Sequence, residues 1–216
     1  FAPTSLQQAV QFLKKNKNTK ILGAATDLGV QINKGKNSLE SYISLHLVSE
    51  LEQIKIIKKK RFWVGAQVTL SELRRATKKD LPELGRFLDL FASPQIKNMA
   101  TLVGNIANAS PIADTPPFLL VQNAHIHVRG RSKKRLVPLE KFYKGYKKTD
   151  LKVGEIIVGV EFDLPTSNEA LKLYKTSQRK DLDISCINAA WRVQWKDKGR
   201  SQIKNARLAL GGVAAT

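Results

Sequence analysis

The sequence predicts an α+β protein with two lobes, a small α/β lobe over residues 1–57 and a larger lobe with an antiparallel sheet over residues 58–210. Helical periodicity alternates with short apolar strands in the first third of the chain. After residue 124, strand-like stretches separated by turn residues follow one another, which is typical of antiparallel sheets. Hydrophobic residues make up 42% of the 216 residues, enough for a packed core.

The first lobe is expected to begin with a helix, because apolar residues recur at helical spacing from Leu6 to Leu13. A strand at 20–22, a short helix or turn at 28–32 and strands at 41–45 and 54–57 are expected to follow. The lysine-rich stretch 58–60 then favours a hairpin turn, with residues 62–65 as the returning strand.

The second lobe is expected to contain two helices followed by strands. Thr69 and Glu72 have the spacing of a capping box, which predicts a helix to about residue 78, and residues 81–92 have amphipathic spacing. We expect strands at 124–128, 135–138, 155–164, 171–176, 185–195 and 202–210, with residues 211–216 as a linker toward a further C-terminal domain.

Composition excludes several classes of function. The single cysteine, Cys186, excludes a disulfide framework within the chain, and we expect it to be a buried, inert thiol. No apolar run is long enough to span a membrane and the first residues do not resemble a signal peptide, so a cytoplasmic protein is expected. The net charge of +19 is spread evenly and accompanies no nucleic-acid-binding motif, so we expect a solvated surface rather than a nucleic-acid partner.

Two turns in the sequence could cradle a phosphate. Residues 23–27 join a predicted strand to a predicted helix, and Thr101–Asn105 form a second such turn. Backbone N–H groups in turns of this kind can bind anions, although each turn taken alone favours an ordinary connection. Residues 93–117 contain only Lys97 and Asp114 as charged residues, which favours a segment that lies against something other than bulk water.

The sequence offers no acid–base or nucleophilic centre of its own. His125 and His127 would share one face of a strand, but two imidazoles without a third ligand are weak evidence for a metal site. Hydrolase and zinc-protease motifs are absent from the sequence. Redox chemistry, if present, would therefore require a cofactor.

Residues 91–114 read FASPQIKNMATLVGNIANASPIAD. They are flanked, in order, by ILGAATDL at 21–28, FYKGYKKT at 142–149, GEII at 154–157, KTSQRKDLDI at 175–184 and LGGVAAT at 210–216. This series resembles the FAD-binding domain of molybdenum hydroxylases of the xanthine dehydrogenase type, over nearly the whole chain. The resemblance implies a two-lobed PCMH-type FAD-binding fold with FAD between the lobes.

The resemblance also implies the roles of individual residues. Two segments would hold the pyrophosphate through backbone N–H groups, and their residues are Ile21, Leu22, Gly23, Ala24, Ala25, Thr26, Asp27 and Leu28, then Thr101, Val103, Gly104 and Asn105. Phe91 would pack beside the flavin, Asp114 would make a polar contact with FAD, and Lys175 would lie near the flavin. Ile157 or Val158 would touch the ring system.

The implied function is that of an oxidoreductase component. Members of the family pass electrons from a molybdenum centre through [2Fe–2S] clusters to FAD and often onward to NAD, so iron–sulfur and molybdopterin subunits are the expected partners. The sequence departs from the family where Ala24, Ala25 and Val103 stand in place of glycine. An FAD-less scaffold or interaction module that keeps the fold is therefore the alternative, and a nucleic-acid-binding protein is a third.

Overall fold

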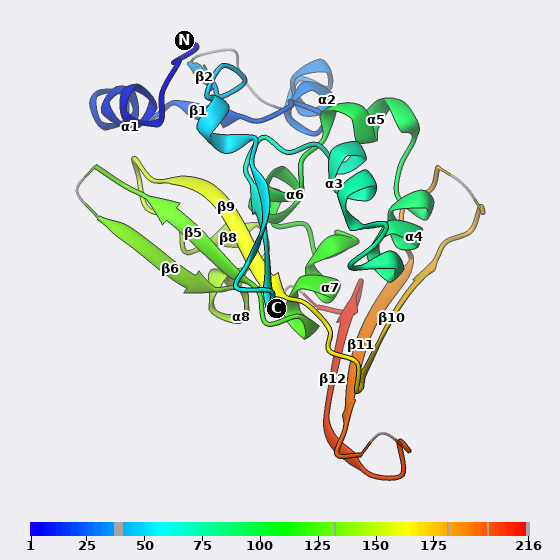
Figure 1. Ribbon diagram of the computed structural model, residues 1–216. Coiled ribbons are helices and arrows are strands. Elements are labelled where there is room, and N and C mark those ends of the chain that lie inside the picture. Colours follow the sequence, from blue (N-terminus) through cyan, green and yellow to red (C-terminus); the bar gives the residue numbers. More distant parts are fainter. Residues whose placement is uncertain (37–40, 132, 181, 198, 215–216) are drawn as a thin grey trace.

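The computed structural model describes residues 1–36, 41–131, 133–180, 182–197 and 199–214, and it is α+β, as predicted (Figure 1). The N-terminal elements lie together at the top of Figure 1. Strands β1 and β2 pair in parallel, and helix α1 buries Ala9, Val10 and Leu13. These elements are α1 (Leu6–Lys15), β1 (Lys20–Leu22), α2 (Leu28–Asn33), β2 (Tyr42–Ser44) and the 3₁₀ helix η1 (Ser49–Leu51).

A five-stranded antiparallel sheet forms the centre of the protein, in the order β3-β4-β9-β5-β6. Its strands are β3 (Ile54–Ile57), β4 (Arg61–Gly65), β9 (Ile156–Asp163), β5 (His125–Arg129) and β6 (Lys134–Pro138). Ile126 and Val128 face the core, while His125 and His127 share the opposite face, as predicted. Strand β3 belongs to this sheet although it ends at residue 57, within the predicted first lobe, and the division of the chain at that residue stays a prediction.

A second, three-stranded antiparallel sheet contains β10 (Glu169–Thr176), β11 (Ile187–Trp195) and β12 (Ile203–Gly211). Its inner face buries Leu171 and Ala190, and helix α7 contacts both β11 and β12. The three expected strands of this region are confirmed. Cys186, just before β11, is exposed, so the expectation of a buried thiol was wrong.

The charge-poor segment is largely helical, and in Figure 1 its helices α6 and α7 lie between the two sheets while α5 lies above them, beside α3. It forms α5 (Pro94–Met99), α6 (Leu102–Asn108) and α7 (Thr115–Val121). Helix α7 has proline in its first turn, where a missing N–H costs nothing, and it is buried along most of its length. The remaining elements are α4 (Pro82–Leu90), α8 (Leu139–Phe142), β7 (Tyr143–Gly145) and β8 (Lys148–Thr149). No helix in the described ranges is both long and apolar enough to cross a membrane.

The predicted capping box at Thr69 is present and opens α3 (Leu70–Thr77). Thr69 Oγ1 accepts a hydrogen bond from the Glu72 N–H at 3.2 Å, and the Glu72 carboxylate accepts one from the Thr69 N–H at 2.8 Å. Thr69 also forms an isolated bridge to Thr101, which connects the start of α3 to the start of α6.

Replacing Thr69 by alanine is expected to lower the free energy of unfolding by about 1 kcal/mol, because the helix loses its side-chain cap. Urea unfolding followed by circular dichroism measures this loss. Glu72→Gln is the control, since glutamine can still accept the bond from the Thr69 N–H. An unchanged unfolding midpoint for Thr69→Ala would show that the cap contributes nothing.

Candidate cofactor-binding site

A cleft of about 640 Å³ lies where the two predicted phosphate-binding turns meet. The loop 23–27 follows β1 on one side, and residues 101–108 at and within α6 form the other. The structure thus brings together most of the residues that the sequence assigned to the site. Those that line the cleft are Ile21, Gly23, Ala24, Ala25, Thr26, Asp27, Leu28, Phe91, Thr101, Val103, Gly104, Asn105 and Ile157.

Leu22 does not belong to this group, since Ile21 lines the cleft and Leu22 does not. Leu22 still positions the loop, since its carbonyl accepts a hydrogen bond from the Leu45 N–H at 3.2 Å.

The first loop presents backbone donors that nothing in the protein uses. Within the described part of the chain, the N–H groups of Ala24, Ala25 and Thr26 donate no hydrogen bond, although all three residues are half-buried. Buried or half-buried N–H groups are normally paired. Free donors in residues that line a cleft are therefore suited to an anionic ligand. Ala25 has a left-handed backbone with φ of 58°.

The second loop is the N-terminus of α6. Thr101 caps the helix, with its Oγ1 accepting from the Gly104 N–H at 2.9 Å, and this side chain is buried. The N–H of Val103 donates no hydrogen bond to any described residue. Val103 has ordinary helical geometry and its side chain joins the core, so this position does not require the backbone freedom of glycine.

Gly23 marks where the two loops face each other. A Cβ added to Gly23 would lie 3.8 Å from Thr101 Oγ1 and 4.0 Å from Gln67 Nε2, which are ordinary contacts. The fold therefore does not require glycine at residue 23, and Gly23 itself lines the open cleft. The methyl groups of Ala24 and Ala25 line this cleft without filling it.

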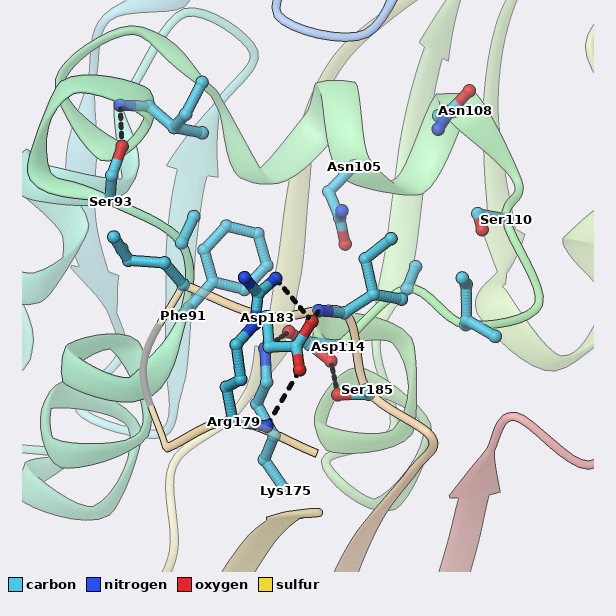
Figure 2. A pocket seen from close by; sticks show the side chains of 16 residues that line it. Phe91, Ser93, Asn105, Asn108, Ser110, Asp114, Lys175, Arg179, Asp183 and Ser185 are labelled. Carbon is cyan, nitrogen blue, oxygen red and sulfur yellow. Dashed lines mark hydrogen bonds and ion pairs between the residues drawn. The ribbon is translucent and has the colours of Figure 1, made fainter. Parts of the chain in front are cut away.

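A second cavity of about 550 Å³ adjoins the cleft and shares Phe91, Asn105 and Asn108 with it. Figure 2 shows Phe91 on one side of this pocket and Asn105 and Asn108 along the helix above it. The pocket also contains Asp114 and Lys175, which the sequence assigned to the flavin end of the site. The two cavities therefore adjoin at Phe91, with the loop 23–27 in the first cavity and Asp114 and Lys175 in the second.

Asp114 and Lys175 form a buried ion pair in the second pocket. Lys175 Nζ lies 2.8 Å from Asp114 Oδ2, and the two side chains are 7% and 8% exposed. The other carboxylate oxygen accepts hydrogen bonds from Ser185 Oγ and from Asn188 Nδ2. Lys175 Nζ also lies 6.0 Å from the centre of the Phe91 ring. The pair therefore connects α7 to the three-stranded sheet at the wall of the pocket.

Lys97 is a residue whose role sequence reasoning missed. Its buried ammonium donates to the carbonyl of Leu88 at 2.9 Å and contacts that of Asp89 at 3.4 Å, at the end of α4. Burial lowers the pKa of Lys97, with Asp89 opposing the change. By holding the last turn of α4, Lys97 fixes the segment from which Phe91 enters both cavities.

The pocket rim contains a further ion pair, between Arg179 and Asp183 (Figure 2). Hydrogen bonds from the Arg179 side chain and backbone lower the pKa of Asp183 to about 2. A depressed carboxyl pKa stabilises the folded arrangement above the pKa of the free carboxyl, near 4. That contribution is lost as pH falls from about 4 toward 2.

We therefore expect the Asp183 carboxyl to titrate near pH 2 rather than near 4. Carbon-detected NMR of the carboxyl group, together with the amide shift of Arg179, measures the midpoint. In Asp183→Asn, the amide shift of Arg179 should lose this acid transition, since its acceptor can no longer be protonated. A midpoint near 4 would show that the pair does not form in solution.

The geometry and chemistry of the site fit FAD. Free backbone N–H groups suit a diphosphate, and the half-buried Phe91 suits a flat aromatic ring. The pocket residues Ser185 and Arg179, and Asn188 behind Asp114, were not found from the sequence. They come from a different part of the chain, and the packing of β11 and β12 against α7 brings Ser185 and Asn188 to Asp114.

Comparisons with known proteins agree with this geometry. The family described as "FAD binding domain in molybdopterin dehydrogenase" matches residues 1–166. A second family, described as "CO dehydrogenase flavoprotein C-terminal domain", matches residues 172–216.

The chain is also similar to curated proteins. It is 30% identical to the nicotinate hydroxylase hnxS of Emericella nidulans and 30% identical to the xanthine dehydrogenase/oxidase of Gallus gallus. Each similarity covers 99% of this chain, but only 17% and 16% of those two proteins. The chain thus spans about a sixth of the length of these relatives.

Solved structures share the fold closely. Carbon monoxide dehydrogenase from Hydrogenophaga pseudoflava matches with a TM-score of 0.92 and 25% identity, over 100% of this chain and 74% of the other. Quinoline 2-oxidoreductase from Pseudomonas putida 86 matches with a TM-score of 0.89 and 27% identity, over 99% and 73%. The chain therefore belongs to the family of FAD-binding domains of molybdopterin dehydrogenases, and FAD is its cofactor.

Proposed function

We propose that this chain is the flavin-bearing, electron-transferring part of an oxidoreductase of the molybdenum hydroxylase class, similar to xanthine dehydrogenase. Electrons would come from iron–sulfur and molybdopterin subunits or domains of the same complex, and would leave to an acceptor such as NAD. The family and the similarity to xanthine dehydrogenase and carbon monoxide dehydrogenase support this proposal.

The observation that carries the proposal is the meeting of two donor-bearing loops at one cleft. The N–H groups of Ala24, Ala25, Thr26 and Val103 would hold the diphosphate of FAD, and no side-chain cation is needed for this. Phe91 would pack against the apolar ring, and Ile157, buried at the wall of the cleft, would add apolar contact.

The protein's own groups would bind and orient the cofactor rather than act as acid or base. Bound FAD supplies the reversible uptake and release of electrons. The Asp114–Lys175 pair would give the pocket wall a fixed dipole with little net charge, because both ions are buried and paired. Asn105 would be held in place by its side-chain oxygen, which accepts a hydrogen bond from Thr115 Oγ1 at 2.6 Å.

An absorbance experiment tests the proposal in two stages. The purified chain, supplied with FAD and freed of excess, should show the two absorption bands of an oxidised flavin. Dithionite should bleach these bands without air, and NADH should bleach them if NAD is the acceptor. A protein bleached by dithionite alone would overturn the NAD assignment. A colourless protein that takes up no FAD would overturn flavin binding and favour the scaffold alternative.

A further inference from the structure

Three alanines adopt the left-handed conformation that favours glycine: Ala25, Ala92 and Ala109, with φ of 58°, 46° and 49°. Such a backbone costs a residue with a Cβ roughly 1–2 kcal/mol relative to the ordinary region. Ala25 lies in the first loop and lines the cleft, and Ala92, next to Phe91, lines both cavities, whereas Ala109 ends α6 and lines neither. The same backbone feature therefore occurs twice inside the candidate site and once beside it.

The surroundings of Ala25 contribute few interactions that would enforce this conformation. The loop joins the three-residue strand β1 to the six-residue helix α2, and α2 has no buried residue. Within the described residues, the loop uses its carbonyl groups in main-chain hydrogen bonds. Ala25 O accepts from the Gly29 N–H at 2.7 Å, and Asp27 O accepts from the Gln31 N–H at 3.0 Å. Strained conformations persist where contacts over-determine them. At this loop the N–H groups of Ala24, Ala25 and Thr26 donate no hydrogen bond within the described residues, and all three residues line the cleft.

Ala109, in contrast, is held by an ordinary helix end. Its N–H donates to Ile106 O at 3.1 Å, which is the bond that terminates helices with a left-handed residue. Helix α6 itself packs into the core through Leu102, Val103 and Ile106. The fold therefore sets the conformation of Ala109 with or without a ligand.

We propose that Ala25 is a positioning residue for FAD, whose left-handed conformation is enforced by the bound cofactor rather than by the fold. In the cofactor-free chain, Ala25 returns for part of the time to negative φ, and the donors of the loop then no longer converge on the cleft. The apparent affinity for FAD is reduced by the fraction of chains in the competent conformation. Glycine, which adopts both regions readily, would remove this bias.

This inference rests on FAD binding at the first loop, and a series of variants at one residue tests it. Ala25→Gly, Ala25→Asn and Ala25→Val are compared with the parent by fluorescence titration with FAD. Gly and Asn tolerate the left-handed region better than Ala, and the β-branched Val tolerates it worse. Affinity is expected to fall in the order Gly, Asn, Ala, Val. Glycine should tighten binding about three- to tenfold, and valine should weaken it at least about tenfold.

Ala109→Gly is the matched control, since it relieves the same backbone strain outside the cavities. It should raise the thermal unfolding midpoint and leave the dissociation constant for FAD unchanged.

Amide hydrogen exchange adds a readout that involves no redox activity. The N–H groups of Ala24, Ala25 and Thr26 should exchange rapidly in the free parent chain and become protected with FAD.

Two outcomes would overturn the inference about Ala25 while leaving FAD binding at the site intact. If Ala25→Gly raises stability but leaves the FAD dissociation constant unchanged, as Ala109→Gly does, the fold itself holds Ala25. If affinity follows side-chain size, so that asparagine binds FAD more weakly than alanine, a steric contact and not the backbone governs binding. A parent chain that binds no FAD at all would instead overturn both the flavin site and this inference.

Discussion

Replacing Gly23 by aspartate is expected to weaken FAD binding at least about 100-fold while leaving the fold intact. A Cβ at Gly23 meets only ordinary contacts, so the chain has room for the side chain. The new carboxylate would lie in the cleft that holds the diphosphate. Two like charges about 4 Å apart in a half-buried site repel by about 4 kcal/mol, which is ample for a loss of this size. Titration with FAD followed by flavin fluorescence measures it.

Two control variants separate charge from size and from position. Gly23→Asn has nearly the shape of aspartate without its charge, and it should lose much less affinity. Gly29→Asp adds the same charge in α2, where a Cβ at Gly29 has no atom within 4 Å, and Gly29 does not line the cleft. If Gly23→Asp binds FAD as tightly as the parent, the diphosphate does not lie at this loop.

Removing Asp114 is expected to destabilise the protein more than the other substitutions considered for this chain. Asp114→Asn leaves the buried Lys175 ammonium without its counter-charge, and breaking such a pair costs about 3–5 kcal/mol. Urea unfolding of the cofactor-free protein measures this loss without a contribution from ligand binding. The flavin pocket should be lost in parallel, because the pair connects α7 to β10 at its wall.

The double variant Asp114→Asn with Lys175→Met tests whether the loss comes from the unpaired charge. Methionine removes the ammonium while keeping an apolar chain of similar length, so the double variant should recover more than half of the stability lost in Asp114→Asn. A double-mutant cycle gives the interaction free energy directly. Strictly additive losses would show that the two side chains stabilise the protein independently.

The strands and the first helices could be predicted from local patterns. The capping box at Thr69 marks the start of α3 because both partners lie within one helical turn. The alternation of Ile126 and Val128 with two histidines identifies β5, since one face of the strand is buried. Helices α5, α6 and α7 were not predicted, because six or seven residues rich in Ala, Asn and Pro are too short for a clear period.

The site could be predicted in part. The two loops were found because a strand–turn–helix order and small residues identify candidate anion sites. Ala24, Ala25 and Val103 stand where the family has glycine, and the sequence could not show which of these positions needs a left-handed backbone. In the structure Ala25 does, and Val103, inside α6, does not. The anchoring of Asp114 by Ser185 and Asn188 was equally invisible, because those residues follow it by more than seventy positions.

A crystal structure of the chain with FAD tests the central claim most directly. We expect the diphosphate between the loop 23–27 and the start of α6, within hydrogen-bond distance of the N–H groups of Ala25 and Val103. The flavin should then extend past Phe91 toward Asp114 and Lys175. A cofactor bound elsewhere, with the methyl groups of Ala24 and Ala25 closing the cleft, would contradict the assignment of these loops.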